Sequence, residues 1–560
     1  MFKKTDPNPQ LDIFTAPSMQ LGSRASKKYS DPNAWHNQFY SLVTTKINEE
    51  IFKPLFPEGK KCGRPNASIR ILVAMSALKE GFGCSDEDLF EKCEFDLLTR
   101  KALGMELLTD VTPSIDTYYL FRRRICEYQE RTGIDLMQLC FEQLAGNQVR
   151  LLKISGKCVR MDSKLIGSNI ARQSRYELIH ATLVKFLKTC TLTHLSPEQE
   201  ERAKEYLKED SSKTVYRSDS DTLQSNLARI GNFIMEMLAV FPATSPAHDL
   251  LLRLFEEQYV VMDGKAVLRD KKEVKADSLQ NPNDPDATYR AKNDQKVQGY
   301  VTNITETVEE GKPNIITSVQ VETAVFADCH FLQEAVENSE RVTDSTIEDL
   351  YADGAYQSPD NREFAKNHNA MQLKTGKMQG GCRWELIPHD EDGLTIREIA
   401  TGNTYEAVKA VTKQGSRKRW RIPWNNKTGW RYFEDKDIKA YQLRKQIESL
   451  PLEEQHKRNN VEAAMFQYSF HTRKGKTRYR GLLKHRMHAY SRCMWMNLRR
   501  MVIFQISTFQ RSIFALFGPI REAFGSFKAI SRKIFTSGAD CYVSLRMTTL
   551  VRLDSKYAPF

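Results

Sequence analysis

Residues 156–165, Gly-Lys-Cys-Val-Arg-Met-Asp-Ser-Lys-Leu, mark the point at which the chain changes from a helical to a strand-like pattern. Four residues of this stretch alternate with the others: Val159, Met161, Ser163 and Leu165. Alternation with a period of two is typical of a β-strand, and Gly156 provides a loop from which the strand can leave. We therefore predict that a β-containing domain begins here.

Further strand-like segments follow this first one. Runs rich in Val, Ile and Thr occupy residues 299–305 and 315–324, and a shorter run at 349–352 ends next to Asp353. A helix is expected over about residues 359–368, before another short strand at Gln372. Strands and helices in this order predict the α/β fold class with a mixed sheet.

The residues before this stretch predict an all-helical domain at 34–150. Apolar residues recur at helical spacing from Trp35 to Ile51, and a second helix is expected to start near Ser68. Three more helix starts are predicted at Ser85, Ser114 and Asp135. Residues 1–33 show no periodicity and are rich in Pro, Ser, Asn and Lys, so we expect a flexible arm there.

Two long stretches interrupt the α/β pattern. Residues 176–285 have helical periodicity and predict a helical insert, whereas residues 376–445 are richer in Gly, Trp and Thr and predict a β-rich insert. The catalytic domain is then expected to span residues 151–505, and residues 506–560 to form a basic C-terminal tail.

The positive charge of the chain is unevenly distributed. The net charge of +12 divides into +16 for residues 457–560 and −4 for the rest of the chain. A basic surplus confined to one region indicates a polyanionic partner such as DNA or RNA, although a solvated surface also explains charge of this kind.

The sequence carries no signal of secretion or membrane insertion. The first residues lack the apolar core of a signal peptide, and no uninterrupted apolar run reaches about 18 residues. The 11 cysteines form no C-x-x-C pair, so we expect reduced thiols and no structural zinc site. We therefore expect a cytoplasmic protein, associated with the nucleoid when bound to DNA, that does not contact a membrane.

Three carboxylates stand out as candidates for catalysis. Asp162 lies in the first predicted strand, Asp353 follows another strand and precedes Gly354, and Glu462 lies near the start of an amphipathic helix. Each also has an ordinary explanation: a hydrogen-bonded strand residue, a turn residue, and one half of a surface pair with Arg458, respectively.

Five motifs carry a resemblance to a known family, and they occur along the chain in the family's order. They are residues 63–105, residues 112–124 with Arg122, residues 284–300, the stretch Tyr351-Ala-Asp-Gly-Ala-Tyr356, and the pair Arg458-Asn-Asn-Val-Glu462 with Arg478-Tyr-Arg-Gly-Leu-Leu-Lys484. Together they resemble the DDE transposases of bacterial insertion sequences, which have a ribonuclease-H-like catalytic fold behind a helical N-terminal domain.

The resemblance implies a function and a site. Asp162, Asp353 and Glu462 would hold two Mg²⁺ ions, with Mn²⁺ as a substitute, because hard divalent cations prefer carboxylate oxygens. Arg458 would position a phosphate. The chain departs from the family's signature at two positions: Gln455 stands where a Tyr is usual, and Ser469 stands where a Lys is usual.

The resemblance also implies a double-stranded DNA partner, comprising the element ends and the target. Besides Arg458, the candidate DNA contacts are Lys474, Lys476, Arg478, Arg480, Lys484, Arg122 and Arg123. The predicted function is metal-dependent cleavage at insertion-sequence ends followed by strand transfer, with a homodimer on DNA. Two alternatives remain open: a nuclease of the same fold without strand transfer, and an inactive DNA-binding protein derived from a transposase.

Overall fold

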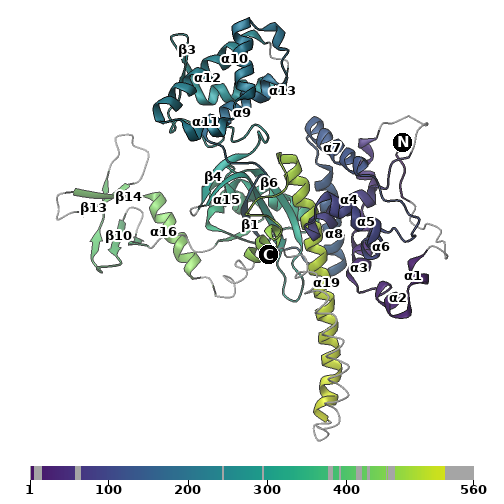
Figure 1. The fold of residues 1–560 in the computed structure, drawn as a ribbon. Helices are drawn as coiled ribbons and strands as arrows, with labels where there is room; N and C mark the ends of the chain where they lie inside the picture. The colour runs from purple at the N-terminus through teal and green to yellow at the C-terminus, as the bar shows by residue number, and fades with distance from the viewer. Residues whose placement is uncertain are drawn as a thin grey trace.

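The computed structural model covers 560 residues, of which it describes 2–5, 16–56, 65–241, 245–292, 295–375, 382–389, 393–410, 419–424, 429–449, 451 and 461–523. Four parts are evident: N-terminal helices, a central sheet, and two inserts that project from it (Figure 1). The predicted mixed α/β fold class is confirmed.

The N-terminal helices begin at the residues that the sequence predicts. Ser68, Ser85, Ser114 and Asp135 are the N-caps of α4, α5, α7 and α8, and each side chain accepts a hydrogen bond from a backbone amide of the first turn. The helices of this region are α3 (Trp35–Leu42), α4 (Ile69–Phe82), α5 (Asp86–Phe95), α6 (Leu97–Leu103), α7 (Ile115–Thr132) and α8 (Leu136–Leu152).

Two details of this region differ from the sequence prediction. The expected arm at 1–33 contains the helices α1 (Pro17–Gln20) and α2 (Ser23–Tyr29), and Tyr29 is buried. The helix expected from Trp35 to Ile51 ends at Leu42 and continues as the 3₁₀ turns η1 (Thr44–Lys46) and η2 (Glu49–Leu55). Pro54, which lacks a backbone N–H, lies inside η2 and disfavours a regular α-helix in that turn.

The central sheet mixes antiparallel and parallel strands. Its order is β4-β5-β1-β7-β8, with β6 also paired to β5; β1 is antiparallel to β5 and parallel to β7, and β7 is parallel to β8. The strands are β1 (Cys158–Gly167), β4 (Thr288–Lys292), β5 (Gln295–Thr307), β6 (Ile316–Thr323), β7 (Asp349–Ala352) and β8 (Gln372–Thr375). This arrangement is consistent with a ribonuclease-H-like core.

Helices cover both faces of this sheet. The first face packs against α14 (Leu332–Thr343), the 3₁₀ turn η4 (Asp328–Phe331) and α15 (Pro359–Asn367), around a core that includes Val159 and Met161 of β1. The second face packs against α18 (Val461–Ser469) and α19 (Leu482–Ala523). The alternation of β1 therefore turns Asp162 and Lys164 towards α18 and α19.

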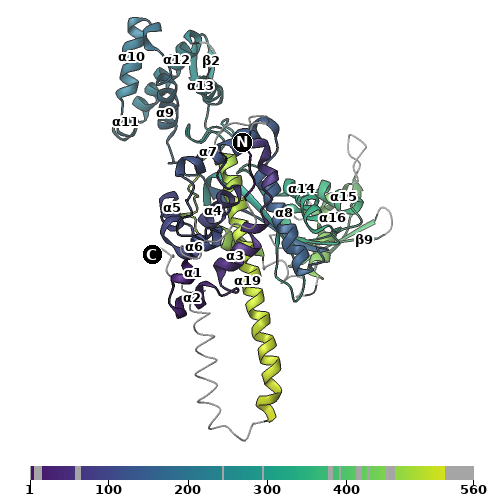
Figure 2. The same cartoon turned by 90° about the vertical axis from the view of Figure 1, so that its right-hand side faces the viewer.

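Helix α19 joins the sheet to the N-terminal helices. It runs between them and then projects away from the body of the molecule, as both views show (Figures 1 and 2). A single buried cluster includes Phe39 of α3, Met75 of α4, Ile304 of β5 and Met494 of α19. Helix α19 continues past residue 505, where the catalytic domain was predicted to end. None of the described helices is long and apolar enough to cross a membrane.

The helical insert lies between β1 and β4 and has its own core. Its helices are α9 (Arg175–Leu187), α10 (Pro197–Lys208), α11 (Ser211–Arg217), α12 (Ser220–Val240) and α13 (Pro246–Gln258), followed by the hairpin β2 (Tyr259–Met262) and β3 (Lys265–Leu268). Ile179, Phe233 and Leu254 are buried inside it. It stands apart from the N-terminal helices in both views (Figures 1 and 2).

The second insert, between β8 and α18, is a pair of small sheets with one helix. The strands β9 (Trp384–His389), β10 (Gly393–Glu398) and β11 (Thr404–Glu406) form one sheet, and β12 (Val408–Ala410), β13 (Arg419–Trp424) and β14 (Gly429–Glu434) form the other. Helix α16 (Asp435–Glu448) follows. Trp384, Trp420 and Phe433 share the core of this insert.

Candidate active site and nucleic-acid interface

Two of the three predicted carboxylates lie at neighbouring positions of the central sheet. Arg160 of β1 is paired with Tyr351 of β7 in a parallel register. Continuing this register by two residues brings Asp162 level with Asp353, which follows the end of β7. Both side chains are half-buried. The fold therefore brings together two residues that are far apart in the sequence, despite the helical insert between them.

Backbone amides hold both carboxylates. Asp162 accepts a hydrogen bond from the amide of Ser163 at 2.8 Å. Asp353 caps the 3₁₀ turn η5 (Gly354–Tyr356) and accepts from the amide of Gly354 at 2.6 Å. A Cβ atom added to Gly354 would meet no other atom within 4 Å, so the space beside Asp353 is open.

The buried hydroxyl of Tyr356 lies within electrostatic range of both carboxylates. It donates a hydrogen bond to Oδ1 of Asn303 at 2.8 Å. Burial raises the pKa of Tyr356 well above its ordinary value, and the negative charges of Asp162 and Asp353 raise it further. Both carboxylates therefore lie within electrostatic range of one buried group, in a region of negative potential.

Glu462 lies at the start of α18 and is exposed. Nζ of Lys164 donates to Oγ of Ser469 at 2.7 Å and to the carbonyl of Met465 at 3.5 Å. Further along both segments, the amide of Gly167 donates to the carbonyl of Gly475 at 2.8 Å. Helix α18 thus runs in the direction of β1, and Glu462 lies about one turn before Met465.

The acidic residues do not form a ready-made metal cage in this conformation. Within the described ranges, no three His, Cys, Asp or Glu side chains converge to hold an ion. Asp162 and Asp353 nevertheless supply the all-oxygen donor set that suits Mg²⁺. Glu462 would complete this set from the adjoining helix, whereas Arg458 lies outside the described residues.

Lys164 is a neighbour of the carboxylates that the sequence analysis missed. Burial lowers the pKa of its ammonium, and the nearby charge of Asp162 opposes this shift. Its contact with Ser469 brings a cation to the position at which the DDE transposase signature usually carries a Lys. The strand period could have identified it, because residues two apart share a face.

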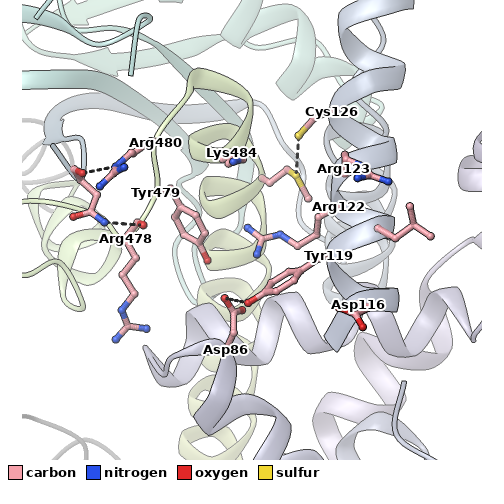
Figure 3. Close-up of a pocket in the computed structure, with 13 residues that line it drawn as sticks. Asp86, Asp116, Tyr119, Arg122, Arg123, Cys126, Arg478, Tyr479, Arg480 and Lys484 are labelled. Atoms are coloured by element: carbon pink, nitrogen blue, oxygen red, sulfur yellow. Dashed lines mark hydrogen bonds between the residues drawn. The ribbon is translucent and has the colours of Figure 1, made fainter. Parts of the chain in front are cut away.

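A cationic cleft of about 850 Å³ lies between α7 and the start of α19 (Figure 3). Five of the predicted DNA contacts line it: Arg122, Arg123, Arg478, Arg480 and Lys484. Two acids, Asp86 and Asp116, also line it, but Nζ of Lys79 already pairs with Asp86 at 2.5 Å. The fold thus gathers cations from two distant segments on one surface.

The basic residues of this region are of two kinds. Some are held by the protein itself: the guanidinium of Arg122 lies 5.4 and 5.1 Å from the ring centres of Tyr118 and Tyr479, and Arg478 donates to the carbonyls at the end of α4. Nζ of Lys476 donates to the carbonyl of Ile170, and Nε of Arg480 to that of Asn169. Arg123, Lys474 and Lys484 are exposed, as are the side chains of Arg478 and Arg480.

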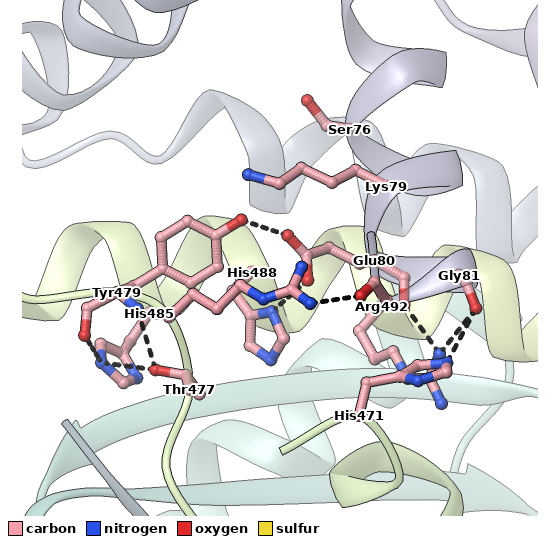
Figure 4. A network of polar contacts seen from close by, with 12 residues as sticks. Ser76, Lys79, Glu80, Gly81, His471, Thr477, Tyr479, His485, His488 and Arg492 are labelled. Atoms are coloured by element: carbon pink, nitrogen blue, oxygen red, sulfur yellow. Dashed lines mark hydrogen bonds and ion pairs between the residues drawn. The ribbon is translucent and has the colours of Figure 1, made fainter. Parts of the chain in front are cut away.

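A polar network fixes one wall of the cleft (Figure 4). Glu80 of α4 pairs with Nδ1 of His488 at 2.7 Å and accepts a hydrogen bond from the hydroxyl of Tyr479. Nη1 of Arg492 donates to the backbone carbonyl of Glu80 at 2.8 Å. Burial alone would raise the pKa of Glu80, but His488, Lys79 and Tyr479 lower it to about 2.

This network ties α4 to α19 and to the segment that carries Arg478 and Arg480. His471 adds a contact to the carbonyl of Gly81 at 3.1 Å, and burial lowers the pKa of His471 to about 4. Nothing in the sequence identified Glu80, because its partners lie some 400 residues away. The cleft is therefore built on a fixed junction between the two ends of the described chain.

The comparison with protein families supplies one match. A family model described as "Transposase domain (DUF772)" matches residues 28–124. The matched residues extend from the end of α2 into α7 and include the cleft residues Arg122 and Arg123. No curated protein and no solved structure matches the chain.

Proposed function

We propose that the chain is a DDE-type DNA transposase, which cleaves at the ends of an insertion sequence and transfers the freed strands into target DNA. The observation that carries the proposal is the parallel pairing of β1 with β7, which brings Asp162, inside β1, level with Asp353, just after the end of β7. The transposase domain at residues 28–124 and the cationic cleft beside it support the same function.

Asp162, Asp353 and Glu462 would hold two Mg²⁺ ions in this proposal, with Mn²⁺ as a substitute. When bound, such ions supply activation of the attacking oxygen and stabilisation of the leaving oxygen. The protein's part is to present the carboxylates: the amides of Ser163 and Gly354 orient two of them. Glu462 would approach them through its position on the first turn of α18.

The proposed chemistry has two steps. In the first, a water oxygen forms a bond to phosphorus at the element end, and the P–O3′ bond breaks. The departing 3′ oxygen takes up a proton and leaves a 3′-hydroxyl on the element. In the second step, this hydroxyl attacks a target phosphodiester, and the target's own 3′ oxygen leaves.

We assign the phosphate contact at this site to Lys164. Its ammonium reaches Ser469 from the same face of β1 that carries Asp162. A partly desolvated cation beside the reacting phosphate would offset charge that builds up on the non-bridging oxygens.

The cationic cleft is the proposed track for double-stranded DNA at the element end. Its exposed cations would contact phosphates and fix the register of the duplex, without reading its sequence. Both ends of an element must be held together before joining, so a homodimer on DNA is part of the proposal.

The test is cleavage and joining of element-end DNA by the full chain in the presence of Mg²⁺. Asp162→Asn and Asp353→Asn should each lower the rate by about 100-fold or more, because a lost metal ligand costs several kcal/mol of transition-state stabilisation. Asp349→Asn is the matched control, since Asp349 begins β7 and pairs with Lys374 at 2.9 Å. It should retain nearly full activity.

Full activity of both site variants would refute the assignment of the carboxylates. Cleavage without joined products would favour a nuclease on this fold. Binding of end DNA by the wild-type chain without cleavage would instead favour an inactive, transposase-derived DNA-binding protein.

A further inference from the structure

The outer face of the sheet β12–β14 presents a ladder of arginines and aromatic rings. Trp420, Ile422 and Phe433 point into the core of the β-rich insert. Their strand neighbours must point outwards, because alternate residues occupy opposite faces. Two of these neighbours are large aromatic residues that remain exposed: Trp430 at 49% and Tyr432 at 41%.

Two arginines of β13 stack on these rings. The guanidinium carbon of Arg419 lies 4.0 Å from the ring centre of Tyr432, and that of Arg421 lies 4.3 Å from the ring centre of Trp430. Because Arg421 is paired with Tyr432 in the register, the two stacks are diagonal and the side chains interleave along the face. Stacking restrains both guanidinium groups before any partner arrives.

These arginines have little internal compensation for their charge. The Nε atoms of Arg419 and Arg421 are buried and lack a hydrogen-bond partner. Arg419 lies 3.9 Å from Glu434, at the limit of an ion pair. In the part of the insert that the structure describes, no carboxylate pairs with Arg421. An anionic partner would supply the compensating charge.

The charge of the insert is divided between its two sheets. Residues 408–434, which include β12–β14, contain eight Lys and Arg residues and one acid, Glu434. Residues 384–406, which include β9–β11, contain six acids and one base, Arg397. The stacked face therefore belongs to the basic half of the insert, and a polyanion is its complementary partner.

We propose that the outer face of β12–β14 binds single-stranded nucleic acid. The exposed edges and open surfaces of Trp430 and Tyr432 offer stacking sites for unpaired bases, while Arg419 and Arg421 contact the phosphates. A duplex keeps its base faces stacked inside, so it can use the arginines but not the rings. This surface is separate from the carboxylates and from the cleft, and the inference does not depend on the proposed catalytic function.

The test is equilibrium binding of a fluorescein-labelled 20-nucleotide oligo(dT) to the full chain, followed by anisotropy in EDTA, so that no chemistry occurs. Trp430→Ala with Tyr432→Ala should weaken binding by about 30-fold, because two stacking platforms are lost. Arg419→Gln with Arg421→Gln should reduce the slope of log K against log salt by about 1.4, which corresponds to two phosphate contacts on a single strand.

Lys436→Gln with Lys439→Gln is the matched control. It removes the same charge from α16 of the same insert, where both lysines are exposed. This variant should bind the oligonucleotide within twofold of wild type. A loss equal to that of the arginine variant would overturn the proposal, because general charge would then explain the binding.

A 20-base-pair duplex distinguishes the two forms of nucleic acid. The aromatic variant should bind this duplex as wild type does, and an equal loss for duplex and single strand would overturn the assignment to unpaired bases. Trp430→Phe with Tyr432→Phe keeps two rings and should retain most of the affinity. The same weak binding in the Phe and Ala variants would mean that a folding defect, not stacking, causes the loss.

Discussion

The N-terminal helices and the helical insert are both all-helical, but they relate to the sheet in different ways. The N-terminal helices share one buried cluster with β5, β6 and α19, whereas the insert encloses a core of its own. The N-terminal region is also tied to α19 by the buried network around Glu80. The first region thus shares its core with the sheet, and the second is a module attached to it.

The root of the helical insert is polar rather than apolar. Asp284 accepts hydrogen bonds from the hydroxyls of Ser168 and Tyr300, the latter at 2.6 Å. Nζ of Lys185 donates to the carbonyl of Pro282 at 2.5 Å, and Nη1 of Arg253 donates to that of Pro285 at 2.9 Å. A few hydrogen bonds can orient a module, but they do not merge its core with that of the sheet.

The largest expected effect comes from breaking the junction at Glu80. Glu80→Gln removes the negative partner of His488 in a side-chain pair that is only 9–12% exposed. Losing the partner of a buried hydrogen-bonding group costs about 1–3 kcal/mol. We expect a clearly lower thermal transition by circular dichroism, with loss of DNA binding in the cleft. An unchanged transition would mean that the network is not what joins the two regions.

The same substitution predicts a change in acid sensitivity. Because the folded pKa of Glu80 is lowered to about 2 from an ordinary value of 4.5, its contribution is present above pH 4.5 and is lost as the pH falls towards 2. The difference in stability between wild type and Glu80→Gln should therefore shrink below pH 4.5. Buried His471 and His485 destabilise the protein over a higher range, below pH 6.5, because burial lowers the pKa of each. The charge of Glu80 opposes this shift at His471, so the His471 contribution should be somewhat larger in Glu80→Gln.

The next largest effect should come from neutralising exposed cations of the cleft. Arg123→Gln with Lys484→Gln removes two exposed cations from the cleft, and it should weaken binding of duplex end DNA by about tenfold. The salt slope should also fall by about 1.8, as expected for two phosphate contacts on a duplex.

The matched control takes two exposed cations from the other helical region. Lys204 and Lys213 of the helical insert are 55% and 69% exposed and, like Arg123, each has an acidic neighbour on its own helix or cap. Lys204→Gln with Lys213→Gln should leave the affinity for end DNA unchanged. Equal losses in the two variants would remove the distinction between the cleft and the general surface.

Much of the fold could be predicted because local signals determine it. The N-caps Ser68, Ser85 and Ser114 and the strand at 349–352 were predicted within a residue or two, since capping and alternation depend on near neighbours. The sharing of a core by α3, α4 and α19 could not be predicted. That depends on contacts between residues several hundred positions apart, for which one sequence contains no signal.

The candidate site, too, could be predicted only in part from the sequence. Asp162 was identified as an acid inside the first predicted strand and Asp353 as one at a strand end, and the parallel pairing of β1 with β7 is what brings them together. Lys164 was missed because its role depends on the contact with Ser469 across the α18 interface. The stacked face of β13 and β14 was missed because the acidic residues of 384–406 offset most of its positive charge when residues 384–434 are counted together.

The smallest expected effect is that of removing the helical insert. If residues 175–275 are replaced by a flexible Gly/Ser linker of about ten residues, the buried clusters of the sheet and the N-terminal helices remain intact. Of the hydrogen bonds at the root, those from Lys185 and Arg253 are lost, at about 0.5–1.5 kcal/mol each. Those that Asp284 accepts from Ser168 and Tyr300 remain. The remaining protein should therefore unfold within a few degrees of wild type, and the isolated insert should show helical circular dichroism with a cooperative transition. Failure of both pieces to fold would mean that the insert is as much a part of the body around the sheet as the N-terminal helices are.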